Sequence, residues 1–249
     1  LVTRRNGKIL ISGNSCGPHS SCLDTVFALL IQQGYSTIPM PSRLFVYWCT
    51  RFLMGTVNSD SGVDNRTLLK AMAKFGWCDE EKWPYDISRF KERPTDECFE
   101  QGQARKIDQY LAIPQDLEQM KGCIANGDPF IFGFSVYSSI DESDSTGIIP
   151  MPQRSDSQVG GHDCIVCGYN SDAEERLGIP ARHFKIRNSW GTSWGRQGYG
   201  FIPYEYAANA GMSGDFWTIK HSMYSPVTPP VPPIPPTPIA ILKAIPAPP

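Results

Sequence analysis

Residues 188–203 read NSWGTSWGRQGYGFIP, and this stretch decides more about the chain than any other of its length. Asn188 is followed at once by Ser189 and Trp190, and then by a second tryptophan and several glycines. An Asn side-chain oxygen can orient an imidazole and select its tautomer without adding charge, and an aromatic ring beside it keeps water away. The stretch therefore predicts a histidine partner for Asn188, with Trp190 as its shield.

His162 is the predicted partner, and it lies in a β-prone stretch, GGHDCIVCGYN, over residues 160–170. A thiol is a useful nucleophile only as thiolate, which a helix N-terminus and a nearby imidazolium both stabilise. The apolar spacing over residues 21–34 predicts a helix that places Cys22 at its N-terminus. Cys22, His162 and Asn188 are thus the predicted catalytic residues.

Near the middle of the chain, the sequence pattern changes from one typical of helices to one typical of strands. Apolar periodicity and capping residues predict helices over residues 42–54, 64–75 and 114–126. Short β-prone runs follow at 130–136, 162–169, 183–188, 199–202 and 216–219. A helical half followed by a strand-rich half predicts an α+β fold with a cleft between two lobes.

Composition narrows the classes of function. The chain has 249 residues, 41% of them hydrophobic, and a formal net charge of −2 with scattered Lys and Arg. We therefore expect a globular protein that binds neither nucleic acid nor a membrane surface. Residues 1–10 show no secretory signal, and since the chain lacks an initiator Met, we interpret it as a processed or trimmed piece of a longer protein.

The last 24 residues hold many of the prolines and predict an extended polyproline II tail over 226–249. A linker is one interpretation, and binding of a partner through an aromatic-lined groove is the other.

The cysteines predict reduced thiols rather than a cystine framework. Eight are present, and with Cys22 as nucleophile seven remain, which cannot all pair within one chain. One or two disulfides, such as Cys78 with Cys98, are the alternative. Reduced thiols favour a reducing compartment, the cytoplasm or a virus particle, over a secreted or lysosomal one.

We expect no cofactor and no metal site. His162, Cys164 and Cys167 look like a zinc cluster, but residues 164 and 167 of a strand point to opposite faces.

The segments around Asn188 and His162 resemble those of a known family. NSWGTSWGRQGYGFIP and GGHDCIVCGYN are similar to the Asn and His segments of papain-like cysteine peptidases of the papain and cathepsin type. Three more segments agree, especially with bacterial and viral-looking members: SRLFVYWCTRFLMGT, SGVDNRTLLKAMAKFGWCDEEKWPYD and QDLEQMKGCIANGDPFIFGF.

The resemblance implies a cysteine endopeptidase whose peptidase domain spans residues 1–225. A helical lobe over about 14–110 would precede an antiparallel, barrel-like lobe over about 111–225. The implied partner is an extended peptide or protein substrate, and a pro-segment is a further possible partner.

The nucleophile loop departs from the family pattern. Cys16 stands where the family has the Gln whose side chain helps to hold the oxyanion, His19 replaces a disulfide cysteine, and Leu23 replaces Trp. No Gln occurs before Gln32, which leaves Asn14 or His19 as other candidate donors. As alternatives to the three catalytic residues, His19 could serve as a local base and Cys16 as the nucleophile. The intact motifs around His162 and Asn188 favour the first assignment.

Four glycines are the implied substrate-binding positions. Gly62 and Gly161 would pair with the backbone of an extended peptide, and Gly133 and Gly160 would border the main specificity pocket. The alternatives to an active endopeptidase are a weakened or inactive papain-like module with a binding or structural role, and an acyl-transfer enzyme such as a transpeptidase or amidase.

Overall fold

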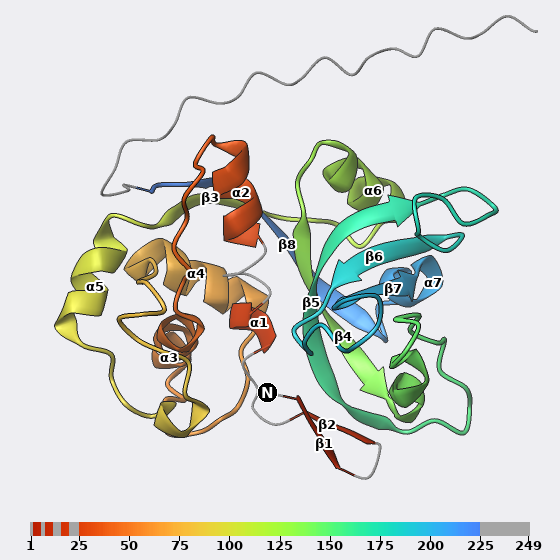
Figure 1. Cartoon of the computed structure of the whole chain (residues 1–249), viewed down its shortest axis with the longest axis horizontal. Helices are drawn as coiled ribbons and strands as arrows, with labels where there is room; N and C mark the ends of the chain where they lie inside the picture. Colours follow the sequence, from red (N-terminus) through yellow and green to blue (C-terminus); the bar gives the residue numbers. More distant parts are fainter. Residues whose placement is uncertain (1, 6–7, 12–15, 20–24, 225–249) are drawn as a thin grey trace, which may run out of the picture.

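Two lobes lie side by side, one built from helices and the other from strands (Figure 1). The computed structural model describes residues 2–5, 8–11, 16–19 and 25–224. The helical lobe comes first in the chain and the strand-rich lobe second, so the expected α+β class is confirmed. A hairpin of β1 (Val2–Arg5) and β2 (Lys8–Ile11) precedes both lobes.

The two long helices, α3 (Arg43–Met54) and α4 (Asn65–Phe75), end at the predicted residues and begin one residue after the predicted starts. Ser42 and Asp64 cap them, because each side-chain oxygen accepts the backbone N–H three residues further on. A cap of this kind contributes about 1 kcal/mol to stability. Gly55 ends α3 in the left-handed conformation, with φ of +72°.

Shorter helices complete both lobes. In the helical lobe they are α1 (Cys16–His19), α2 (Val26–Gln32), η2 (Ile87–Arg89) and α5 (Asp96–Gln103). In the strand-rich lobe they are α6 (Leu117–Ala125), η3 (Ser138–Ser143) and α7 (Tyr204–Ala208).

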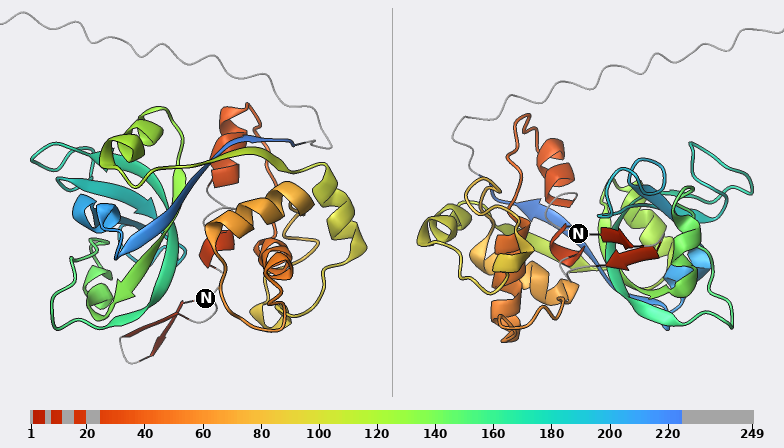
Figure 2. Two further views of the ribbon diagram at one scale, coloured as in Figure 1. Left: turned by 180° about the vertical axis from the view of Figure 1, so that it is seen from behind. Right: turned by 60° about the horizontal axis from the view of Figure 1, so that its bottom comes forward.

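Six antiparallel strands form the sheet, in the order β3-β8-β4-β5-β6-β7. They are β3 (Ile107–Ala112), β4 (Phe130–Tyr137), β5 (Gln158–Asn170), β6 (His183–Arg187), β7 (Tyr199–Pro203) and β8 (Ser213–Ser222). The first half of β8 pairs with β4 and its second half with β3 (Figure 2). β8 therefore runs from the strand-rich lobe toward the helical lobe and joins the two.

The central strands β4 and β5 separate two hydrophobic cores. Successive side chains of a strand point to opposite faces. On β4, Phe130 and Phe132 pack in the core of the strand-rich lobe, whereas Ile131 packs in the core of the helical lobe. On β5, Cys164 and Ile165 divide in the same way. The face of β5 on which a residue falls therefore decides which lobe it meets.

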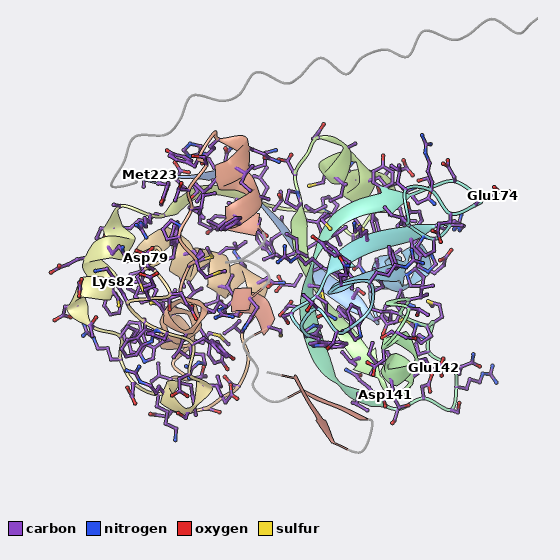
Figure 3. The ribbon with its side chains drawn as sticks, in the orientation of Figure 1. Asp79, Lys82, Asp141, Glu142, Glu174 and Met223 are labelled. Atoms are coloured by element: carbon purple, nitrogen blue, oxygen red, sulfur yellow. The ribbon has the colours of Figure 1, made fainter. Side chains whose placement is uncertain are left out.

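A buried ion pair braces the helical lobe on the side away from β5. The Asp79 carboxylate accepts hydrogen bonds from Arg105 and from Gln101, and Arg105 also lies over the Trp77 ring. Figure 3 labels Asp79 and Lys82 on this lobe, and Lys82 forms an ion pair with Glu97 of α5. These contacts tie α5 to the loop that follows α4.

Several boundaries differ from the sequence-based predictions. The helix predicted from residue 114 begins only at Leu117, because the side chain of Asp116 caps it there. The strand around His162 is longer than predicted, and neither α5 nor β3 was predicted. In the described ranges, every helix is too short or too polar to cross a bilayer.

The alternative pairing of Cys78 with Cys98 is absent from the structure. Among the residues that the structure describes, no cysteine is in a disulfide. Cys78, Cys98 and Cys49 are all buried in the helical core, and burial together with the neighbouring Cys98 thiol raises the pKa of Cys78. They act there as small apolar side chains.

Candidate active site

His162 of β5 and Asn188, which follows β6, form the centre of the site. His162 Nε2 lies 2.8 Å from Asn188 Oδ1, and the same Oδ1 accepts the backbone N–H of Ser189 at 2.8 Å. Since a backbone N–H can only donate, this atom of Asn188 is the amide oxygen. His162 Nε2 therefore carries the hydrogen, and Nδ1 carries the lone pair of the neutral imidazole.

Aromatic rings enclose the imidazole. Trp190 stacks on His162 with 4.7 Å between ring centroids, Phe134 meets it edge-on at 5.6 Å, and Trp194 braces Trp190 at 5.2 Å. His162 is only 3% exposed, and this burial lowers its pKa to about 4, although the hydrogen bond with Asn188 acts in the opposite direction. In these surroundings the imidazole is neutral at pH 7.

Nδ1 of His162 is the second nitrogen of the ring, and it is buried. No described residue gives this buried nitrogen a hydrogen bond. Cys22, the predicted nucleophile, lies outside the described residues, as does Asn14, and α2 is described from Val26 onward. A buried polar atom without a partner costs free energy. Because Nε2 is occupied by Asn188, Nδ1 is the nitrogen of His162 that remains available to accept a proton.

The Cys16 thiol, at the position of the expected oxyanion donor, is engaged by Asp163. Cys16 is the first residue of α1, and its Sγ donates to Asp163 Oδ2 at 3.7 Å. Burial, and after it the charge of Asp163, raises the pKa of the Cys16 thiol to about 12. A thiol has one hydrogen, so a Cys16 bound to Asp163 does not offer it elsewhere.

The same pKa argues against Cys16 as the nucleophile. A thiol with a pKa near 12 is protonated at neutral pH, whereas the reactive form is the thiolate. His19, at the end of α1, packs edge-on against Tyr85 with 4.9 Å between ring centroids. This contact holds the His19 ring against the helical lobe.

Three of the four predicted substrate-binding glycines line one cavity with His162. The cavity has a volume of about 490 Å³, and its walls include Gly62, Gly133 and Gly161. Gly160 is not among its lining residues. A Cβ placed on Gly160 would meet nothing within 4 Å, so this position does not narrow the space.

Buried polar side chains hold the loop that carries Gly62. The Arg51 guanidinium donates to the carbonyl oxygens of Val57 and Ser59, at 2.8 and 3.2 Å, and lies over the Tyr47 ring. Tyr47 Oη accepts the backbone N–H of Gly62 at 3.3 Å. With φ of +74°, Gly62 adopts a conformation that favours glycine. The loop is therefore held at the cavity by side chains of α3.

A second cavity of about 510 Å³ lies on the Asn188 side of the pair. His19, Arg43, Tyr85 and Asn188 are among the residues that line it. His162 lines the first cavity and Asn188 the second, so each member of the hydrogen-bonded pair borders a different cavity.

Sequence reasoning missed Asp163, Asp215 and Phe134, all of which line the first cavity. The signal for Asp163 was present: it follows His162 on a strand and so must face the opposite lobe. The conformation of Asp215, with φ of +58°, left no recognisable signal in the sequence.

The cysteines of β5 behave as strand geometry requires. Cys164 is buried, and its thiol lies 3.6 Å from Asn188 Oδ1, whereas Cys167 is exposed, with its thiol 3.7 Å from the Lys185 carbonyl. Over the described part of the chain, no group of three or more His, Cys, Asp or Glu side chains could hold a metal ion.

Comparison with known proteins places this geometry in a family. The model of the papain family of cysteine proteases matches residues 21–219. An uncharacterised peptidase C1-like protein, L477, of Acanthamoeba polyphaga mimivirus is 34% identical over 216 residues, which is 83% of this chain and 67% of that protein. A cathepsin L of Sarcophaga peregrina is 32% identical over 91 residues, 36% of this chain and 25% of its own length.

Solved structures agree in fold. Xylellain, a cysteine protease from Xylella fastidiosa, has a TM-score of 0.74 and 37% identity, over 83% of this chain and 79% of its own. A Carica candamarcensis cysteine protease solved in complex with E-64 has a TM-score of 0.58 and 18% identity, over 84% of this chain and 89% of its own, which shows the fold alone. The expected fold and the expected class of enzyme, a cysteine peptidase, are both confirmed, and this chain belongs to the papain family of cysteine proteases.

Proposed function

We propose that this chain hydrolyses peptide bonds inside a polypeptide, with Cys22 as nucleophile, His162 as general base and acid, and Asn188 as the group that orients His162. The observation that carries the proposal is the 2.8 Å contact of His162 Nε2 with Asn188 Oδ1, which leaves the Nδ1 lone pair available. The two cavities that border the pair support an endopeptidase, because an extended substrate can continue in both directions.

The proposed reaction has two steps. Nδ1 of His162 takes the proton of the Cys22 thiol, the thiolate attacks the carbonyl carbon, and the imidazolium returns the proton to the leaving amine as the C–N bond breaks. Water then attacks the thioester carbon while His162 accepts its proton. The imidazolium returns this proton to sulfur as the C–S bond breaks, which releases the acid and restores the thiol.

The environment of His162 suits this exchange of protons. A base with a pKa of about 4 is neutral and able to accept a proton at pH 7, but it holds that proton weakly. A thiolate a few ångströms from Nδ1 would raise the pKa of His162, because an opposite charge at this range shifts a pKa by about 1 to 3 units. We therefore propose that the charged pair forms only when the Cys22 thiol meets His162.

The oxyanion hole is the weak part of the proposed enzyme. The backbone N–H of Cys22 is one proposed donor, but the Cys16 thiol is bound to Asp163. Loss of one oxyanion donor in a hydrolase lowers kcat by about 10² to 10³. This contact also favours the second candidate function, a papain-like module that binds peptides and cleaves them slowly or not at all.

Labelling of the active site tests the proposal. We expect iodoacetamide or a peptidyl epoxide to modify Cys22 well below pH 8, and we expect the Cys22→Ala variant to lose both labelling and cleavage of unstructured peptides. Cys167→Ser is the matched control, because Cys167 is exposed but lies on the opposite face of β5 from Cys164 and Asn188. Mass spectrometry that finds the label on Cys16, or no cleavage in the wild type, would overturn the proposal.

A further inference from the structure

The cavity beside His162 is lined by three carboxylates from separate parts of the chain. Asp64 precedes α4, Asp163 lies on β5, and Asp215 lies on β8. Among the described residues that line this cavity, none is a lysine or an arginine. We refer to this cavity, defined by Asp64, Asp163 and Asp215, as the acidic pocket.

The fold holds these three carboxyl groups in place with uncharged donors and, among the described residues, pairs none of them with a cation, and burial raises the pKa of Asp163 to about 7. Asp64 Oδ1 caps α4, and Asp215 Oδ2 accepts the backbone N–H of Asn65 at 2.6 Å. Asp163 Oδ1 accepts from the Asn65 side-chain amide at 3.0 Å. All these donors are uncharged, and within the described part of the chain none of the three carboxylates forms an ion pair with Lys or Arg.

A second observation shows that the acidic pocket faces the reacting atoms. His162 lines the same cavity, and so do Gly62 and Gly161; His162 is buried, and among the described residues its Nδ1 has no hydrogen-bond partner. Glycines at these positions let a peptide backbone approach closely. A substrate bound along them would carry its side chains directly over the pocket.

The uncharged part of the lining suits a long side chain with a charged end. Met54, Val63 and Phe134 contribute apolar walls. Lysine and arginine bury their methylene stems along such surfaces while the charged head reaches polar groups. A glutamate in the same place would lie against three carboxylates, and like charges that are close together destabilise each other.

We propose that the acidic pocket binds the side chain of a lysine or arginine of the substrate close to the cleaved bond, and that Asp163 and Asp215 determine this specificity. This inference rests on the proposed peptidase function. It adds the substrate class: basic rather than acidic or purely apolar peptides.

Scanned peptides test the proposal. A series of internally quenched peptides carries one Lys, norleucine or Glu at each of four positions on either side of the cleaved bond. At one position we expect kcat/KM to be about tenfold higher for Lys than for norleucine, and lowest for Glu. Norleucine matches the lysine stem without its charge, so this ratio isolates the contribution of the carboxylates.

Variants connect the preference to the pocket. Asp163→Asn and Asp215→Asn should each reduce the ratio of Lys to norleucine toward one. Asp116→Asn is the matched control, because Asp116 caps α6 as Asp64 caps α4 but does not line the pocket, and it should leave the ratio unchanged. Cleavage without any preference for Lys, or a preference that survives both variants, would overturn the inference.

A binding measurement separates the inference from the proposed function. In the Cys22→Ala protein, calorimetry with the same peptides reports pocket selectivity without cleavage. If the wild type cleaves nothing while Cys22→Ala still binds the Lys peptide more tightly than the norleucine peptide, the proposed activity fails and the pocket assignment stands. Equal binding of the two peptides contradicts the pocket assignment, whatever the activity.

Discussion

Two adjacent residues of β5 show how one strand serves two opposite environments. His162 faces the strand-rich lobe, where Trp190 and Phe134 enclose it and Asn188 orients it. Asp163 meets α1 and α4 of the helical lobe, where Cys16 and the Asn65 amide are its partners. Burial lowers the pKa of His162 to about 4 and raises that of Asp163 to about 7.

In both places burial suppresses the charged form of the group, whatever the sign of the charge. On the His162 side, suppression leaves a neutral base ready to accept a proton. On the Asp163 side, the buried carboxyl accepts a hydrogen bond from the thiol of Cys16, the residue at the position of the expected oxyanion donor. The proposed chemistry is therefore well supported on one face of β5 and weakened on the other.

Removal of the base should have the largest effect. His162→Ala should lower kcat/KM for peptide cleavage by about 10⁴-fold or more, because the proposed proton transfers all pass through this side chain. His221→Ala is the control, since this exposed histidine contacts Asp108 at 2.6 Å and lies outside both cavities. Equal losses in the two variants would show that the effect is structural, which circular dichroism would reveal.

Restoring the side-chain oxyanion donor at position 16 should have the next largest effect. Cys16→Gln places an amide donor where the family has one, and it should raise kcat by about 10² to 10³. Steady-state kinetics on one quenched peptide measures the change. An unchanged kcat would mean that another group, such as His19, already holds the oxyanion. No cleavage by either protein would favour the binding module.

The Asp163 carboxyl should make stability fall as the pH rises. Its folded-state pKa of about 7 exceeds the ordinary aspartate value of 3.8, so the folded protein holds this proton more tightly and its contribution to stability is lost as the pH rises through 7. The groups around it are Cys16, Asp64 and Asp215, none of which carries positive charge.

Urea unfolding at several pH values measures this effect. Relative to Asp163→Asn, the wild type should lose about 2 kcal/mol of the free energy of unfolding between pH 4 and pH 8; a three-unit shift would allow about 4, reduced because Asp163 retains contact with solvent. His162 acts in the opposite direction between pH 4 and 6.5 and is common to both proteins. Parallel pH profiles would contradict the protonated carboxyl.

Loss of the aromatic shield should have the smallest effect. Trp190→Leu should raise the pKa of His162 and lower kcat/KM about tenfold, because water would then compete for the hydrogen bond between His162 and Asn188. NMR titration of the His162 ring follows the pKa directly. Trp83→Leu, a substitution at a buried tryptophan of the helical lobe, controls for lost packing and should leave the His162 pKa unchanged.

The sequence alone predicted the fold class, the main helices and strands, and the pairing of His162 with Asn188. Each of these depends on short-range patterns: Ser42 and Asp64 cap helices a few residues away, and β4 and β5 alternate their apolar side chains. The stretch that contains Asn188 and Trp190 carries its function in consecutive residues, so reading it required no coordinates.

The surroundings of Cys16 and the lining of the cavity depend on contacts between residues far apart in the sequence. The thiol of Cys16 meets a carboxyl 147 positions further along the chain, and the acidic pocket joins Asp64, which precedes α4, with Asp163 of β5 and Asp215 of β8. Such contacts depend on how the lobes pack, and no local periodicity encodes them. The sequence therefore determined which residues form the His162–Asn188 pair, whereas the packing of the two lobes determined the charge beside it.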